Sequence, residues 1–71
     1  MDKRMFECID EKHNKFWEVW TEDDKLYTRY GKIETVGQLT CIGFNDGEEA
    51  VKGAEKLVAQ KLKKGYVEVD E

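Results

Sequence analysis

An aromatic residue and a lysine stand two positions apart near the middle of the chain, at Tyr30 and Lys32, with Gly31 between them. A tyrosine ring can stack on a base or a sugar, and a lysine neutralises a phosphate as a point charge. Residues two apart in a strand point to one face of a sheet, so these two side chains should lie together. With Trp20 from the preceding strand, they predict a surface made by Trp20, Tyr30, Gly31 and Lys32 that binds nucleic acid or a protein partner.

Each of these residues also has a purely structural explanation. Trp20 and Tyr30 could pair across neighbouring strands and shield the hairpin from water, which would contribute about 0.5–1 kcal/mol. A glycine inside a strand, such as Gly31, marks either a bend beside which an aromatic ring lies flat or room for a ligand, and we favour the bend. Lysines at the end of a helix complement its dipole whether or not they touch phosphate, which applies to Lys61, Lys63 and Lys64.

The remaining residue types exclude most catalytic chemistry. The chain has no serine and a single histidine, His13, which lies in a polar turn, so a hydrolytic triad is unavailable. Cys8 and Cys41 lack the CxxC spacing and the nearby histidines of a zinc site, and no Walker loop, GxGxxG or EF-hand spacing is present. Carboxylates gather in the turn Glu22-Asp23-Asp24 and at the tail Asp70-Glu71, where solvation explains them. We therefore expect a non-enzymatic chain with no cofactor and no metal.

Size and charge restrict the partners further. A chain of 71 residues allows one domain, residues 1–71, with a thin core. Twelve Lys and Arg oppose sixteen Asp and Glu for a net charge of −4, so any site for a polyanion must be local. The sequence has no run of 18 apolar residues and no stretch like a signal peptide, so we expect no membrane partner and a cytoplasmic location. Cys8 and Cys41 are then expected to be buried free thiols, with a disulfide between them as the alternative.

The hydrophobic pattern has period two or is densely apolar from Met5 to about Phe44, and it changes to a period of 3.6 from Asn45. The first part predicts strands joined by polar turns, with a tight turn at Asp23-Asp24 between the second and the third. The predicted strands are Met5–Asp10, Lys15–Glu22, Lys25–Ile33 and Gln38–Phe44. The pattern therefore predicts an α+β fold, a small antiparallel sheet of about four strands packed against one C-terminal helix.

The predicted helix runs from Asp46 to Lys64. Asn45 with Glu48 resembles a capping box, and the acidic first turn and basic last turn both suit the helix dipole. Gly65 should end the helix in the left-handed conformation, with Tyr66 packing back against the last turn.

The helix carries one apolar stripe that must cover a face of the sheet. We expect this to be the face opposite Tyr30 and Lys32, which leaves both side chains exposed. A short final strand could follow at Val67 and Val69. The residues expected to point inward are Trp17, Val19, Leu57, Val58 and Leu62, with either Leu39 and Cys41 or Ile42 and Phe44.

The stretch Arg29-Tyr30-Gly31-Lys32-Ile33, followed by Gly37-Gln38, resembles the motif of the WGR domain family. That motif is a Trp-Gly-Arg core continued by an apolar residue, a turn and Gly-Gln. The resemblance extends over roughly residues 5 to 68 and implies an antiparallel sheet crossed by one helix. It includes the strand Lys15-Phe16-Trp17-Glu18-Val19 before the motif, Glu49-Ala50 in the helix, and the ending Lys63-Lys64-Gly65-Tyr66-Val67-Glu68.

The resemblance implies a binding module. WGR domains occur in DNA-dependent poly(ADP-ribose) polymerases, where they contact DNA ends and neighbouring domains, and in bacterial proteins labelled molybdate metabolism regulators. In the polymerases, the Trp and Arg of the motif meet the sugar-phosphate end of a strand. Here Tyr30 replaces the Trp, Lys32 the Arg and Glu34 a common Gly, so the resemblance implies only weak binding of nucleic acid, because the bidentate fork is lost and an acid is added. The alternative is a protein-interaction or scaffolding module of a bacterial regulator, or a homodimer.

Overall fold

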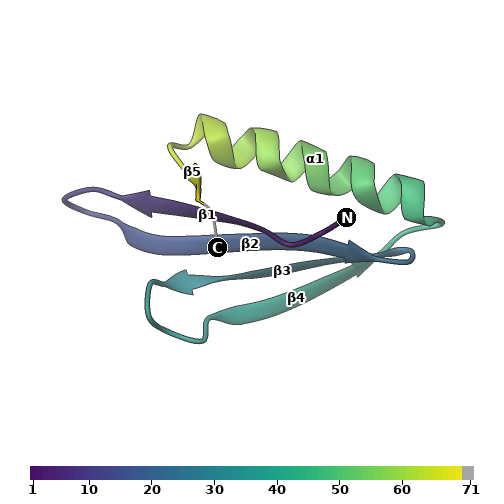
Figure 1. Ribbon diagram of the computed structural model, residues 1–71, viewed down its shortest axis with the longest axis horizontal. Coiled ribbons are helices and arrows are strands. Elements are labelled where there is room, and N and C mark those ends of the chain that lie inside the picture. The colour runs from purple at the N-terminus through teal and green to yellow at the C-terminus, as the bar shows by residue number, and fades with distance from the viewer. Residues whose placement is uncertain (70–71) are drawn as a thin grey trace.

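Five antiparallel strands and one helix make up the computed structural model, which describes residues 1–69 (Figure 1). The α+β class is as predicted, but the sheet has five strands where about four were expected, and the helix is followed by a strand. The predicted acidic tail, Asp70-Glu71, lies outside the described residues. The elements are β1 (Arg4–Ile9), β2 (Asn14–Glu22), β3 (Lys25–Lys32), β4 (Gln38–Gly43), α1 (Gly47–Lys63) and β5 (Val67–Val69), and the strand order in the sheet is β4-β3-β2-β1-β5.

The start of α1 is fixed by a side-chain cap one residue later than the sequence suggested. Asp46 is the N-cap, and its Oδ1 accepts the backbone N–H of Glu49 at 2.8 Å. The Glu49 carboxylate in turn accepts the N–H of Asn45 at 3.3 Å. The cap is therefore made by Asp46 and Glu49, where Asn45 and Glu48 were expected, and it satisfies one of the N–H groups that the helix leaves without a partner.

The end of α1 leads directly into β5. Gly65 has a φ of 100°, its N–H donates to the carbonyl of Leu62 at 3.2 Å, and the N–H of Tyr66 donates to the carbonyl of Lys61 at 3.0 Å. This is the bonding pattern of a Schellman motif, which reverses the chain at once. Tyr66 is buried, and the three residues of β5 pair with β1, so the optional final strand is confirmed. No helix within residues 1–69 is long and apolar enough to cross a bilayer.

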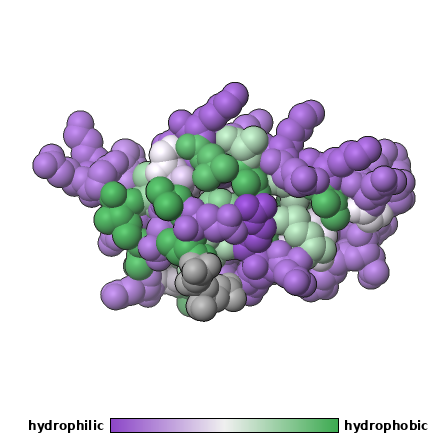
Figure 2. All heavy atoms as spheres, turned by 45° about the horizontal axis from the view of Figure 1, so that its top comes forward, coloured by the Kyte–Doolittle hydropathy of each residue, from purple (hydrophilic) through white to green (hydrophobic). Residues whose placement is uncertain are grey.

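The core lies between α1 and one face of the sheet, which Figure 1 shows with the helix on a single side. Trp17, Val19 and Val58 are buried there and Leu57 packs against them, as predicted, whereas Leu62 is 50% exposed and was wrongly expected inside. On the face seen in Figure 2, hydrophobic residues form separate patches among hydrophilic side chains. The buried residues of the cluster are Phe6, Cys8, Trp17, Val19, Leu26, Ala54, Val58 and Tyr66.

The two alternatives left open for β4 are decided by its pairing with β3. Phe44 packs against the core, as one alternative predicted; Ile42 pairs with the buried Leu26 and lies on the same side, but it is 50% exposed and was wrongly expected inside. Leu39 and Cys41 lie on the opposite, open face and are exposed. The expectation that both cysteines are buried is therefore wrong for Cys41, because β4 is an edge strand with no helix over this face. Both thiols are free.

Candidate nucleic-acid interface

The register between β2 and β3 places Tyr30 on the helix side of the sheet, contrary to expectation. The two-residue turn pairs Glu22 with Lys25, which puts Tyr30 opposite the core residue Trp17. Directly paired residues of antiparallel strands share a face. The helix therefore lies over the same face as Tyr30, and the prediction that it covers the opposite face is wrong.

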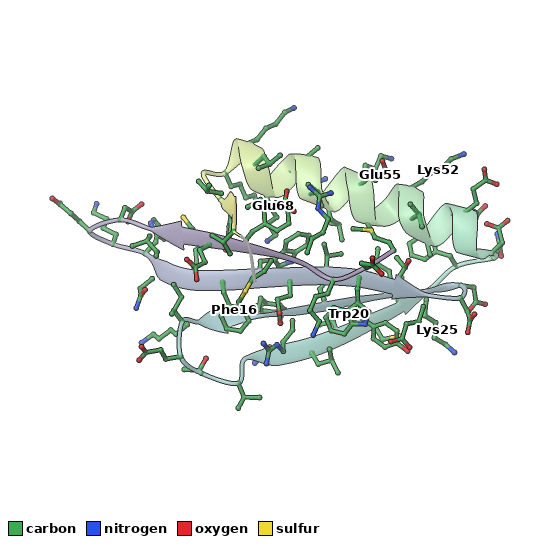
Figure 3. The ribbon with its side chains drawn as sticks, viewed as in Figure 1. Phe16, Trp20, Lys25, Lys52, Glu55 and Glu68 are labelled. Carbon is green, nitrogen blue, oxygen red and sulfur yellow. The ribbon has the colours of Figure 1, made fainter. Side chains whose placement is uncertain are left out.

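Trp20 pairs with Tyr27 on the open face and does not join Tyr30. Its ring stacks on that of Tyr27 with centroids 5.5 Å apart and an interplanar angle of 10°, and Lys3 Nζ lies 4.7 Å from the Trp20 ring. Figure 3 shows Trp20 extending from β2 away from the helix. The predicted surface of Trp20, Tyr30, Gly31 and Lys32 is thus split, with Trp20 and Gly31 on one face and Tyr30 and Lys32 on the other.

Tyr30 and Lys32 remain accessible because they lie beside the end of the helix and not beneath it. Tyr30 is 40% exposed, and Lys32 is also exposed. The Tyr30 hydroxyl donates to Gln38 Oε1 at 3.2 Å, which orients the ring. A groove of about 430 Å³ opens at this point, and it is lined by Lys15, Phe16, Tyr30, Gly31, Lys32, Lys61 and Tyr66.

Three lysines line this groove, and none of them has an acidic partner among residues 1–69. Lys15 is the cross-strand partner of Lys32, so two like charges face each other, an arrangement that costs stability. Lys61 reaches the same place from the last turn of α1. The ion pairs that occur within residues 1–69 join Arg4 to Glu68, His13 to Asp10 and Arg29 to Glu18, and none includes these lysines.

Aromatic rings lie next to two of these lysines, Lys15 and Lys61. Lys61 Nζ lies 5.5 Å from the ring centroid of Trp17 and 5.2 Å from that of Tyr66, and Lys15 Nζ lies 5.7 Å from Tyr66. Burial lowers the pKa of Lys61 from its ordinary value, and the nearby charges of Lys64 and Lys15 lower it further. An anion in the groove would relieve this repulsion, whereas a cation would add to it.

Gly31 is explained by close packing of the backbone. A Cβ at this position would lie 2.9 Å from the Cα of Gly37, and a Cβ on Gly37 would lie 2.8 Å from Cζ of Phe16. The chain therefore turns tightly against the Phe16 ring, which supports the bend over a space for ligand. Glu34 has a φ of 72° in the same loop, a left-handed conformation that favours the glycine expected from the family resemblance, and Glu34 does not line the groove.

The sequence analysis missed some residues that the structure brings together. Lys15 and Tyr66 were not considered for binding, although the two-residue turn fixes Lys15 opposite Lys32. The expectation that no histidine lies near a cysteine is also wrong, because the β1–β2 hairpin places ligand atoms of Cys8, Asp10 and His13 within 4.8 Å of one another. A hairpin register between β1 and β2 would have revealed this cluster. Lys63 and Lys64 do not line the groove, and Lys64 acts on it only through its charge.

Comparisons with known proteins agree with this architecture. The chain is 44% identical over 66 residues to the uncharacterized protein YfeS of Escherichia coli, and 43% identical over 65 residues to protein YehF of the same organism. These alignments cover 93% and 92% of the chain but only 27% and 24% of the two relatives, so the chain spans about a quarter of their length.

A crystal structure of a protein from Bacteroides fragilis is also similar, with a TM-score of 0.95 and 42% identity over 97% of this chain and 20% of that one. The model of the WGR domain family matches residues 2–71. This match includes the strand with Tyr30, Gly31 and Lys32, on which the resemblance was first based. The chain therefore belongs to the WGR domain family.

Proposed function

We propose that this chain is a non-catalytic binding module that holds a phosphate-bearing end of nucleic acid in the groove beside the end of α1. The observation that supports this most is the gathering of Lys15, Lys32 and Lys61 around the exposed Tyr30 ring and the buried Tyr66 ring, in a chain of net charge −4, with no acidic partner among residues 1–69. Unpaired like charges are costly to keep together unless a ligand neutralises them. Nucleic acid supplies both a phosphate for the lysines and a base or sugar that can stack on the exposed Tyr30 ring.

In this proposal the phosphate lies among the three lysine ammonium groups, and the terminal sugar or base stacks on Tyr30. The Tyr30 ring is held by its bond to Gln38, so little entropy is lost when a base packs on it. Lysines neutralise phosphate without the bidentate geometry of arginine, so orientation would come from the ring. Binding is expected to be weak and strongly dependent on salt, because lysines that neutralise phosphate release its counterions.

An NMR titration at low salt tests the proposal. The titrant is a recessed-end duplex with a 5′-phosphate, compared with the same duplex without it. Expected are shifts confined to the groove residues, stronger with the phosphate, and reduced in Lys32→Gln and Lys61→Gln. Lys25→Gln is the matched control, because Lys25 is exposed at the opposite end of β3 (Figure 3).

Two results would remove the proposal. The first is an absence of shifts at millimolar duplex. The second is an equal loss of binding in Lys25→Gln and Lys32→Gln, which would show that the chain responds to total charge and not to the groove.

A second candidate function is a protein-interaction or scaffolding module within a longer bacterial regulator, of which a molybdate metabolism regulator is one example. All six residues of β4 are exposed, and this edge strand carries no charged side chain to prevent pairing with another strand. Its free thiol, Cys41, suits the reducing cytoplasm in which we expect such a module. Sedimentation across concentration separates the two functions: self-association that Thr40→Lys abolishes favours scaffolding, and a monomer at all concentrations counts against a homodimer.

A further inference from the structure

A second cluster of reactive side chains lies at the β1–β2 hairpin, beyond the end of the groove. The pairing of β1 with β2 ends at Ile9 and Asn14, and the N–H of Asp10 donates to the carbonyl of His13 at 2.9 Å. Asp10 and His13 thus face each other across the loop. Cys8 lies in β1 on the helix side, two residues before Asp10, which follows the end of the strand. The ligand atoms of Cys8, Asp10 and His13 all lie within 4.8 Å of one another.

The carboxylate of Asp10 is held in a fixed position. Its Oδ1 accepts the backbone N–H groups of Lys12 and His13, both at 2.7 Å. Nδ1 of His13 lies 2.9 Å from Oδ1 and 3.0 Å from Oδ2. Backbone bonds to one carboxylate oxygen orient the other, as outer contacts do in metal sites. Oδ2 has only the His13 ring as a partner, and a bound ion would replace this contact.

We propose that Cys8 Sγ, Asp10 Oδ2 and the imidazole of His13 bind one Zn²⁺ ion, with the fourth coordination position open to solvent. A thiolate, an imidazole and a carboxylate together suit zinc, whereas Mg²⁺ and Ca²⁺ prefer oxygen ligands alone. Ligands of a tetrahedral zinc ion lie roughly 3.4–3.6 Å apart. The present separations, from 2.9 Å to at most 4.8 Å, fall on both sides of that value, so side-chain rotation suffices to close the site.

The charges of the proposed site balance. Cys8 gives up its thiol proton to solvent on binding, and the resulting thiolate and the Asp10 carboxylate neutralise the two charges of the ion. Cys8 is 7% exposed and would bind from the core side, whereas Asp10 and His13 are exposed and would bind from the solvent side.

Asp10 and His13 line a hollow of about 410 Å³ together with Lys15 and Lys32. A zinc ion with three protein ligands normally keeps water or an anion as its fourth ligand. The proposed site is therefore next to the lysines of the groove, but its ligands are different residues. Zinc binding can be tested without any nucleic acid, and its failure would leave the groove proposal unaffected.

The test is a titration of the reduced, chelator-treated chain with Co²⁺ alone, followed by displacement with Zn²⁺. The expected result is a thiolate-to-cobalt charge-transfer band that saturates at one ion per chain and disappears on addition of zinc. His13→Gln and Asp10→Asn should each weaken binding at least tenfold. Cys8→Ser should abolish the band. Cys41→Ser and Glu11→Gln are the matched controls, a thiol on the other face and an exposed acid in the same loop, and both should bind like the unaltered chain.

Three outcomes would overturn the site. They are the absence of a charge-transfer band in the unaltered chain, its persistence in Cys8→Ser with loss in Cys41→Ser, and unchanged affinity in His13→Gln. Cys8 packs in the core, and its replacement can unfold the chain. Substitution of the exposed His13 therefore provides an independent test of zinc binding. Zinc should raise the melting temperature of the unaltered chain but not that of His13→Gln, and an equal rise in both would also contradict the proposal.

Discussion

On the open face of the sheet, Arg29 Nε donates to Glu18 Oε1 at 2.6 Å and Trp20 stacks on Tyr27, so these two charges and these two rings have partners within the fold. In the groove beside the end of α1, by contrast, Lys15, Lys32 and Lys61 lie together with no carboxylate partner in the described part of the chain. Both regions combine basic and aromatic side chains. The difference is that Arg29 on the open face is paired with a carboxylate of the same chain, whereas the groove lysines can be neutralised by a bound anion.

The largest effect should come from breaking the ion pair of the open face. Arg29→Met leaves the Glu18 carboxylate, whose side chain is 4% exposed, buried without its partner. We expect a loss of about 2–3 kcal/mol in the free energy of unfolding, at the low end for a buried pair because Arg29 is 35% exposed. Denaturant unfolding measures this loss. The double variant Arg29→Met/Glu18→Leu should recover most of it, and a loss as large in the double as in the single variant would contradict this account.

The groove should respond in the opposite way, with a change in binding and little change in stability. Lys32→Gln/Lys61→Gln should weaken binding of the phosphorylated duplex by about 1 kcal/mol per lysine, or roughly 25- to 50-fold in total. The free energy of unfolding should change by less than about 0.5 kcal/mol, because relief of repulsion offsets the lost contacts with aromatic rings. Fluorescence anisotropy and denaturant unfolding of the same variant test both parts. A large loss of stability would mean that these lysines are structural.

A smaller effect is expected in the loop between the groove and the open face. Glu34→Gly should raise the free energy of unfolding by about 0.5–1 kcal/mol, because glycine adopts the left-handed φ of 72° without the cost that a side chain carries. Thermal unfolding measures the gain. Gly37→Ala is the matched opposite change, since Gly37 has a φ of 75° and no room for a Cβ, and it should destabilise the chain. Stabilisation by both variants would contradict the assignment of strain.

The smallest effect concerns the protonation of Lys61. Its pKa is lowered in the folded chain by burial and then by Lys64 and Lys15, so folding disfavours its charged form. Stability should therefore rise as the pH increases through the lowered pKa towards the ordinary value. A bound phosphate should raise the pKa again, and duplex binding should decline as the pH passes it. NMR titration of the lysine side chains, with and without duplex, measures both; a pKa that duplex leaves unchanged would place the ligand elsewhere.

Much of this arrangement could be predicted from the sequence. The caps, the apolar stripe and the Gly65 stop gave α1 to within one residue at each end. Alternation along β2 and β3 separated the correct sets of side chains. The two-residue turn at Asp23-Asp24 also fixes the register, which pairs Trp20 with Tyr27. Counting residues from this turn would have shown that Trp20 and Tyr30 do not lie together.

Other features depend on contacts that no local pattern encodes. Lys61 and Tyr30 line the same groove because of where the helix crosses the sheet. That crossing depends on close packing, for example at Gly53, where a Cβ would lie 2.7 Å from Cζ of Phe44. The cluster at Cys8 and His13 depends on a loop of four residues without the Gly or Asn that would have marked its turn type.

The carbonyl of Lys61 accepts the N–H of Tyr66, so the residue that presents its ammonium group to the groove also anchors the backbone from which β5 departs. Occupation of the groove should therefore slow amide hydrogen exchange at Tyr66 and along β5, although no ligand atom would touch that strand. Hydrogen exchange in β5 would then measure whether a ligand is bound at the Lys61 side chain.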